Sequence, residues 1–390
     1  MYPNLSYILH SIFGTEPDNA FSIIQTFGLF LALSFVVGAY LLKIELKRKA
    51  NEGLFKPSIV EKTGKNEFNW IDVLVNGLIL GIVLTKAIQI MMDYQGFSAD
   101  PSGFLLSTKG PWFILLLVAG SYIFWRWNSW KKLSNNDSEI HRIMIYPHDR
   151  VGDITVLAAF SGVIGSKLFS VFEDLPAFFD NPFHVFFSGS GLNIYGGLIV
   201  GFLAVFYYLR KHKIDVLHVM DSIAPALIFS YGVGRMGCQL SGDGDWGIVN
   251  TKAVPSWWFL PDSWWASRYP HNVIDEGVAM ADCTWKHCMQ LSQAVYPTPI
   301  YEIFFALIIF AILWALRKRI AAPGVLFFVY MVLNGFERFW IEKIRINDKY
   351  NMLGLKLTQA ELIAVIYMMV GAFCIYYFNK RYKDAQQANA

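Results

Sequence analysis

The residues best suited to chemistry lie in residues 229–247, where an apolar run meets one arginine, Arg235, followed by two carboxylates, Asp243 and Asp245. This stretch also holds six glycines: Gly232, Gly234, Gly237, Gly242, Gly244 and Gly247. An arginine at the mouth of an apolar segment is costly without an anionic partner, and its planar guanidinium suits a phosphate. Glycine permits sharp turns and a close approach of the backbone to a ligand. The stretch therefore predicts a phosphate site. The competing interpretation is a packed helix end whose arginine reaches the water.

A second group of charged residues lies near the end of a later apolar segment. Arg338, Glu342 and Arg345 are spaced at i, i+4 and i+7, which places them on one face of a predicted helix. We expect this face at the same depth of the membrane as Arg235, and two arginine clusters at one depth favour a shared anionic ligand. The alternative is that these charges only anchor a helix end.

Polar residues at two other segment ends complete the candidate site. Tyr195 precedes Gly196 and Gly197, after a Ser/Gly-rich stretch at 188–193 that predicts a tightly turned or re-entrant entry into the membrane. Tyr195 is then either an interface aromatic or a hydrogen-bond donor and proton carrier. Lys167, at the end of the preceding apolar segment, is a candidate third cation.

Tyr301 and Glu302 open a further apolar segment, behind Pro297 and Pro299. Proline is favourable at a helix start, and a carboxylate in the predicted first turn suits the positive end of the helix dipole. The Glu302 carboxylate is equally suited to an ion pair with one of the arginines.

Composition decides what kind of element positions these residues. Of the 390 residues, 55% are hydrophobic and 16% charged, and the mean hydropathy is +0.38. A helix that crosses a bilayer needs about 20 mainly apolar residues. Nine blocks reach or approach that length: 22–43, 72–93, 111–127, 153–172, 194–210, 217–236, 298–316, 323–341 and 360–378. We predict an all-α, polytopic membrane protein with about nine spans and no nucleic-acid partner. Residues 1–20 lack the pattern of a cleavable signal.

The distribution of lysine and arginine predicts the orientation. Basic clusters follow the first, third, fifth, seventh and ninth blocks, so we expect the N-terminus outside and the C-terminus in the cytoplasm; the segment after the eighth block is the exception. The predicted parts are an N-terminal span (1–44), an inserted segment with two extra spans (45–150), a catalytic membrane core (151–380) with an outer loop (237–297), and a cytoplasmic tail (381–390).

The cysteines and histidines predict neither a metal site nor a cofactor. The four cysteines do not form a zinc pattern, and the eight histidines are scattered. Cys283 and Cys288 share one loop and can pair if it faces an oxidising compartment, which the sequence leaves open. Asp243 with Asp245 is a thin version of the aspartate cluster that a metal-dependent lipid phosphotransferase needs.

With these motifs in view, the chain resembles the bacterial phosphatidylglycerol–prolipoprotein diacylglyceryl transferase family. The resemblance rests on three stretches in order, over residues of about 150–380 and the first span: 195–199 (Tyr-Gly-Gly-Leu-Ile), 234–247 around Gly-Arg-Met-Gly, and 297–302, with Phe-Glu-Arg at 336–338. It implies that Arg235 and Arg338 are the essential arginines, Glu342 their acidic partner and Gly247 a required glycine.

The chain also departs from the family pattern. Tyr195 stands where many members have histidine, and Cys238 where many have asparagine. The family's Gly-Glu is matched by Gly242-Asp243, with one extra residue before Trp246. Because the family usually has seven spans, residues 45–150 are interpreted as an insertion. The proton acceptor thus stays open among Tyr195, Asp243 and Glu342.

The resemblance implies a reaction and a location. Family members transfer the diacylglyceryl group of phosphatidylglycerol to the lipobox cysteine of a prolipoprotein signal peptide, releasing glycerol phosphate. Expected partners are therefore phosphatidylglycerol, the prolipoprotein and membrane lipids, in the bacterial inner membrane with the site toward the outer leaflet. The alternatives are an outer-leaflet phospholipid-binding or transport protein, an inactive paralogue, or a metal-dependent lipid phosphotransferase.

Overall fold

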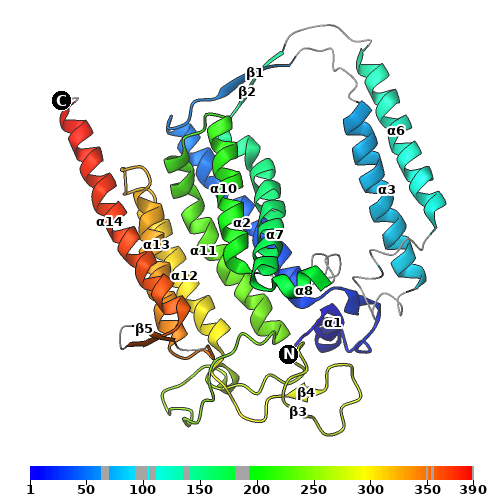
Figure 1. The fold of residues 1–390 in the computed structure, drawn as a ribbon, viewed down its shortest axis with the longest axis vertical. Coiled ribbons are helices and arrows are strands. Elements are labelled where there is room, and N and C mark those ends of the chain that lie inside the picture. Colours follow the sequence, from blue (N-terminus) through cyan, green and yellow to red (C-terminus); the bar gives the residue numbers. More distant parts are fainter. Residues whose placement is uncertain are drawn as a thin grey trace. The chain divides into compact units, whose positions relative to one another are not determined.

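The computed structural model describes residues 1–62, 70–93, 104, 111–134, 141–180, 193–347, 350–352 and 355–388, and Figure 1 shows its elements. Within these ranges, nine long helices coincide with the nine apolar blocks of the sequence: α2 (Thr26–Asn51), α3 (Trp70–Met92), α6 (Trp112–Ser134), α7 (Val151–Glu173), α10 (Ile194–Lys211), α11 (Val216–Ser241), α12 (Thr298–Leu316), α13 (Val325–Glu342) and α14 (Gln359–Ala388). The predicted all-α membrane fold is confirmed. Six helical segments of the described part are long and apolar enough to cross a bilayer, so the number of spans and their orientation stay predictions.

Short elements precede the first long helix or connect later ones. Within the described ranges these are the helices α1 (Leu5–Phe13) and α8 (Leu175–Asp180) and the 3-10 turns η1 (Ala20–Ile23), η2 (Pro147–Arg150) and η3 (Asp262–Trp264). Six short strands form three antiparallel pairs: β1 (Ser58–Lys62) with β2 (His141–Ile145), β3 (Val278–Ala279) with β4 (Met289–Gln290), and β5 (Tyr350–Met352) with β6 (Leu355–Leu357). The β1–β2 register pairs Ser58 with Ile145, so the chain leaves and returns at adjacent points on either side of α3 and α6.

The chain divides into two compact units. The first unit contains residues 1–55, 147–155 and 206–390; the second contains residues 56–146 and 156–205. Of the predicted site residues, Lys167, Tyr195, Gly196 and Gly197 belong to the second unit, and all the others belong to the first.

In the first unit, α11 packs against α2 and α12, and α13 packs against α14. Small residues allow the close approach: a Cβ at Gly237 would lie 2.8 Å from the Cβ of Phe30 on α2. Further from the C-terminal end of α11, a buried apolar cluster joins α11, α12 and α13: Ile228, Ala306, Ile309, Leu313 and Leu326. These contacts fix the helix ends that carry the charged side chains.

An extended segment, residues 242–297, lies between α11 and α12, beside the N-terminus (Figure 1). The loop was predicted to begin at residue 237, but α11 continues to Ser241, and Gly242 ends it with a φ of +66°. The segment has its own buried cluster of Trp246, Tyr269, Leu291 and Val295. Cys283 and Cys288 form a disulfide, which answers the question that the sequence left open.

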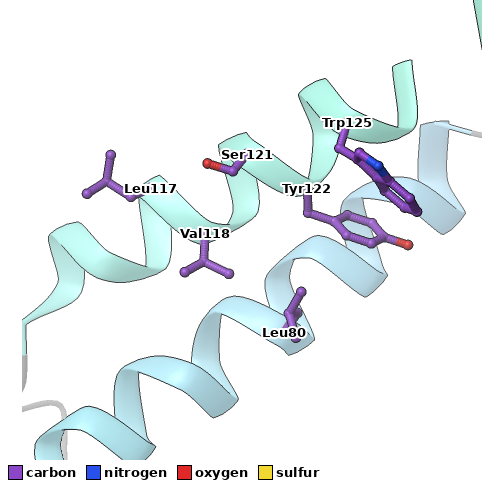
Figure 2. Close-up of a pocket in the computed structure, with 6 residues that line it drawn as sticks. All are labelled: Leu80, Leu117, Val118, Ser121, Tyr122 and Trp125. Atoms are coloured by element: carbon purple, nitrogen blue, oxygen red, sulfur yellow. The ribbon is translucent and has the colours of Figure 1, made fainter. Parts of the chain in front are cut away.

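In the second unit, glycines bring neighbouring helices together. A Cβ at Gly81 of α3 would lie 3.0 Å from the carbonyl oxygen of Leu115 on α6, and one at Gly196 of α10 would collide with Phe169 and the Gly165 carbonyl on α7. Figure 2 shows an open, mainly apolar groove along α3 and α6, lined by Leu80, Leu117, Val118, Ser121, Tyr122 and Trp125. None of these residues is charged.

A candidate phosphate-binding site

Arg235 lies in the last two turns of α11, where its side chain is 14% exposed and surrounded by acids. Its Nε lies 2.9 Å from Glu302 Oε2 in an ion pair, and its guanidinium also forms a short contact with the Asp245 carboxylate. Beneath it, the Tyr231 ring lies 5.2 Å from the guanidinium carbon, within cation–π distance. The anionic partners that the sequence requires for this arginine are therefore present.

Glu302 is the carboxylate that three arginines share. Its side chain is fully buried; besides Arg235, it lies 3.6 Å from Arg338 and 3.6 Å from Arg345. The predicted ion pair of Glu302 is thus confirmed, but its predicted place in the first turn is wrong: α12 begins at Thr298, so Glu302 lies one turn further in. Its carboxylate contacts the guanidinium groups and not the free N–H groups at the start of the helix.

Arg338 and Arg345 reach Glu302 by different routes. Arg338 pairs at 3.1 Å with Glu342, one turn later on α13. The prediction that Arg345 continues this helix face is wrong, because α13 ends at Glu342. Arg345 instead lies in a short extended segment that forms an isolated β-bridge with Gly247. We call Arg235, Arg338 and Arg345 the arginine cluster.

Gly247 allows that bridge to form. A Cβ at this position would strike the carbonyl oxygen of Ile344 and lie 2.9 Å from the Thr298 side chain. The Gly247 N–H donates to the carbonyl of Tyr296 at 2.8 Å, which ties the segment after α11 to the start of α12. The predicted requirement for glycine therefore has a steric reason: three backbone segments meet there.

Asp245 is the acid that sequence reasoning underestimated. Its Oδ1 accepts from Arg345 at 2.5 Å and its Oδ2 contacts Arg235, while its backbone carbonyl accepts from Thr298 Oγ1 at 2.6 Å. Burial alone would raise the pKa of this carboxyl, but Arg235 and then Arg345 lower it below its usual value. The paired carboxylates of the arginine cluster are Asp245, Glu302 and Glu342.

Asp243, one of the three candidate proton acceptors from the sequence, has no arginine within ion-pair distance in the described part of the chain. Its Oδ1 accepts from the Asp245 N–H at 3.3 Å, and its side chain lies beside the Cys238 thiol. Burial, and then the negative charge of Asp245, raise the pKa of Asp243 above its usual value. A carboxyl group of this kind is better suited to exchange a proton than to hold a guanidinium group in an ion pair.

Cys238, Asp243 and Asp245 also form the one cluster of described residues whose spacing could hold a metal ion. The Sγ of Cys238 and one oxygen of each aspartate lie within 4.8 Å of one another. Both oxygens of Asp245, however, already contact guanidinium groups. A cation bound there would have to compete with two arginines.

The remaining predicted residues have different surroundings. A Cβ at Gly234 would meet no atom within 4 Å, so this position leaves open space beside Arg235, whereas Gly237 is occupied in packing against α2. The Tyr301 hydroxyl donates to the Trp265 carbonyl at 3.3 Å and so supports the segment between α11 and α12.

In the second unit, Tyr195 is exposed in the first turn of α10, and Gly196 and Gly197 pack against α7. Lys167 is buried on α7. The roles of these residues in the site stay predictions, and the Ser/Gly-rich entry at 188–192 lies outside the described residues.

Asp245 and Glu337 were named within the sequence motifs but given no role in the phosphate site, although each carries a signal. Asp245 stands directly before Trp246-Gly247, the pair whose backbone joins the arginine cluster. Glu337 precedes Arg338 inside an apolar helix, where an ionisable residue indicates function. The residues given roles from the sequence were their charged neighbours, Asp243 and Arg338.

Comparison with known proteins assigns the chain to a family. Residues 104–377 match the family described as prolipoprotein diacylglyceryl transferase. Phosphatidylglycerol–prolipoprotein diacylglyceryl transferase from Corynebacterium diphtheriae is 30% identical over 229 residues, 57% of this chain and 76% of the relative. Its namesake from Corynebacterium glutamicum is 28% identical over 240 residues, 60% of this chain and 71% of the relative. That from Dehalococcoides mccartyi is 26% identical over 298 residues, 74% of this chain and 98% of the relative. Because the family match spans most of the sequence, the chain belongs to the prolipoprotein diacylglyceryl transferase family.

Proposed function

We propose that this membrane enzyme transfers the diacylglyceryl group of phosphatidylglycerol to the lipobox cysteine of prolipoproteins, the first step of lipoprotein maturation. The observation that carries the proposal is the arginine cluster: three guanidinium groups from α11, α13 and the segment after α13 meet around the buried Glu302. The names of the relatives agree with this chemistry, since they specify phosphatidylglycerol and prolipoprotein.

The arginine cluster is suited to the leaving group of this reaction. The cysteine sulfur forms a bond to the glyceryl carbon, the carbon–oxygen bond to phosphate breaks, and its electron pair leaves on the phosphate oxygen. Glycerol phosphate therefore gains one negative charge in the transition state. Fixed guanidinium donors stabilise that charge more strongly at a poorly hydrated site than in water. A guanidinium group can also donate two parallel hydrogen bonds to two oxygens of the same phosphate.

The paired carboxylates hold the cluster in place before the lipid binds. Without them, three like charges within a few ångströms of Glu302 would repel one another, and their long side chains would adopt many rotamers. Asp245 and Glu302 each contact more than one arginine and so fix the spacing between guanidinium groups. Such preorganisation reduces the rearrangement needed at the moment of reaction.

Asp243 is our candidate for the base that takes the thiol proton. The substrate thiol reacts as its thiolate, so a base must accept a proton beside the phosphate. Glu342 is occupied by Arg338 and by Asn347, whereas Asp243 lacks an arginine partner and its pKa is raised by burial and by Asp245. Tyr195 remains the predicted alternative for this role.

We further propose that the site faces the outside of the bacterial inner membrane, at the outer leaflet. The disulfide between Cys283 and Cys288 supports this orientation, because disulfides form in oxidising compartments and this one lies in the segment that carries Asp245. The basic residues in or just after the last turns of α2, α10 and α12 favour the cytoplasm for these helix ends.

For the domain organisation, we propose that residues 45–150 are an inserted segment attached to a catalytic core of 151–380. The pairing of β1 with β2 supports an insertion, because the chain passes through α3 and α6 and returns to the residue opposite its departure. Replacing residues 63–140 by a short flexible linker should leave the transferase reaction measurable. Loss of activity in a variant that still folds would show that these helices belong to the catalytic part.

The test of the proposed function compares three proteins in liposomes that contain phosphatidylglycerol and a lipobox peptide. Mass spectrometry follows the gain of one diacylglyceryl group on the peptide cysteine in wild type, Arg235→Ala and Arg317→Ala. Arg317 is a matched control, because its side chain is also 14% exposed and its Nε pairs at 2.8 Å with a buried glutamate, Glu45. We expect turnover in wild type and in Arg317→Ala, and a loss of about 10²–10³-fold in Arg235→Ala.

Each other outcome points to a specific alternative. Equal losses in both variants would mean that Arg235 acts through stability rather than through phosphate. Binding of phosphatidylglycerol without any peptide modification in wild type would favour the phospholipid-binding or inactive paralogue. A metal-dependent lipid phosphotransferase would bind its cation at Cys238, Asp243 and Asp245. This alternative predicts that EDTA abolishes activity and that a divalent cation restores it.

A further inference from the structure

Glu337 on α13 is a buried acid with no part in the proposed transfer reaction. The residue is 1% exposed, and neither of its carboxylate oxygens has a hydrogen-bond partner within the described residues. An ionised carboxylate in such a position loses its hydration without a compensating contact, which strongly disfavours the charged form. Glu337 differs in this respect from Glu361 on α14, which is equally buried but pairs with Lys343 at 2.5 Å.

Glu337 directly precedes Arg338 of the arginine cluster on α13, and its electrostatic neighbours include Tyr231 and Tyr330 from the apolar core of the first unit. On the core side, Tyr231 and Tyr330 pack against the buried cluster of α11, α12 and α13. Charged and titratable groups from the helices packed against α13 interact electrostatically with Glu337. They are Tyr231 and Arg235 on α11, Glu302 on α12, Tyr330 and Arg338 on α13, and Arg345 in the segment after α13. Tyr367 on α14 interacts with Tyr330.

The charges of the site are already balanced without Glu337. The arginine cluster carries three positive charges, and each of the three paired carboxylates contacts at least one of its members. A bound phosphodiester adds one negative charge to this neutral set. A fourth carboxylate in contact with the same groups would therefore compete with the phosphate, unless it keeps its proton.

We propose that Glu337 is a positioning residue that remains a neutral carboxylic acid while phospholipid binds, and that its ionisation weakens phosphate binding and sets the upper pH limit of the site. The inference rests on the proposed role of the arginine cluster. Neutral Glu337 adds no negative charge to the balanced set, so no further anion opposes the lipid headgroup. Once ionised, it acts as an internal anion that opposes the same headgroup from the core side.

The test measures the affinity of a short-chain phosphatidylglycerol by calorimetry from neutral to alkaline pH, with the full-length enzyme in detergent micelles. Binding is measured instead of turnover because the substrate thiol also titrates in this range, whereas the phosphodiester of the probe keeps its charge. A unit charge within about 10 Å, at an effective dielectric constant of about 20, changes affinity by roughly tenfold. We expect wild-type affinity to fall by about that factor as pH rises.

Four variants separate the contribution of Glu337 from those of other groups. Glu337→Gln is permanently neutral and should not show the fall, whereas Glu337→Asp keeps an acid and should retain it. Glu361→Gln removes an equally buried acid that has a cation partner, and should retain the fall as well. Repeating the comparison in an Asp243→Asn background removes the other acid of the site that lacks an arginine partner among the described residues.

Two results would overturn the inference. One is the same pH dependence in wild type and Glu337→Gln; if the amide does not fold, Glu337→Leu takes its place in the comparison. The other is an infrared difference spectrum, wild type minus the neutral variant, without the carbonyl stretch of a protonated carboxyl group at neutral pH. If wild type binds no phosphatidylglycerol at any pH while that stretch is present, the proposed function fails, and the binding role of Glu337 fails with it.

Discussion

Replacing Glu302 by glutamine tests whether phosphate and carboxylate share the same guanidinium groups. Glutamine keeps the shape of the side chain and removes the charge that Arg235, Arg338 and Arg345 share at 2.9, 3.6 and 3.6 Å. Removing one partner of a buried ion pair costs about 3–5 kcal/mol. Each arginine keeps another carboxylate, Asp245 or Glu342, so we expect the lower end, a loss of about 3 kcal/mol in the free energy of unfolding.

The lipid should reverse most of this loss. Phosphatidylglycerol offers its phosphate to the guanidinium groups that have lost Glu302, and a ligand present at about 100 times its dissociation constant stabilises the folded state by about 2.7 kcal/mol. The variant also carries one more net positive charge at the site, so it should bind the lipid more tightly than wild type does. We therefore expect the difference in melting temperature between variant and wild type to shrink as phosphatidylglycerol is added.

The assay is thermal unfolding in detergent micelles, with and without short-chain phosphatidylglycerol, and with phosphatidylcholine as the lipid control. Glu361→Gln is the matched variant, because it also removes a buried, ion-paired glutamate but lies outside the cluster. It should lose stability that phosphatidylglycerol does not selectively restore. If the lipid stabilises Glu302→Gln no more than it stabilises wild type, the arginine cluster is a structural ion-pair network and the phosphate lies elsewhere.

Three further predictions concern other parts of the site. Gly247→Ala should cost about 1–3 kcal/mol of stability and most of the activity, because its Cβ would collide with the Ile344 carbonyl; melting curves and the peptide assay check both effects. Replacing Cys283 and Cys288 by serine should lower the free energy of unfolding by about 2 kcal/mol, and in wild type an impermeant maleimide should label these cysteines only after reduction. Turnover should rise with pH through the raised pKa of Asp243, because a base works only when deprotonated; Asp243→Asn should remove that rise and lower kcat by about 10²–10⁴-fold without weakening lipid binding.

The parts of the fold that depend on local properties were predictable from the sequence. A run of about 20 apolar residues specifies a helix because the backbone must satisfy its hydrogen bonds within the segment, and the nine long helices lie where the nine runs are. Arg235 was predictable for a related reason, since a guanidinium at the end of such a run needs an anion. Neither conclusion requires knowledge of which helices are neighbours.

The parts that depend on contacts between distant segments were not predictable. Asp245, and not Asp243, pairs with the arginines because of the bridge between Gly247 and Arg345. That bridge joins positions about a hundred residues apart in the sequence. The helical spacing of Arg338 and Arg345 predicted that the two arginines lie close together on one helix face. They do lie near the same carboxylate, but α13 ends between them, and the bridge to Gly247 holds Arg345 in place. A periodic pattern cannot indicate where tertiary contacts replace a helix by an extended segment.

Charge balance links these observations to the reaction. An anion-binding site built only from arginines would be unstable in a membrane protein, because the guanidinium groups would repel one another. Here three arginines are matched by three paired carboxylates, while the acids beside them, Asp243 and Glu337, have no arginine at ion-pair distance among the described residues. A neutral Glu337 adds no negative charge to this balanced set when the phosphate binds. In the proposed reaction an ionised Asp243 accepts the thiol proton and loses its charge as the phosphate gains one, so the total charge of the site and its substrates stays constant.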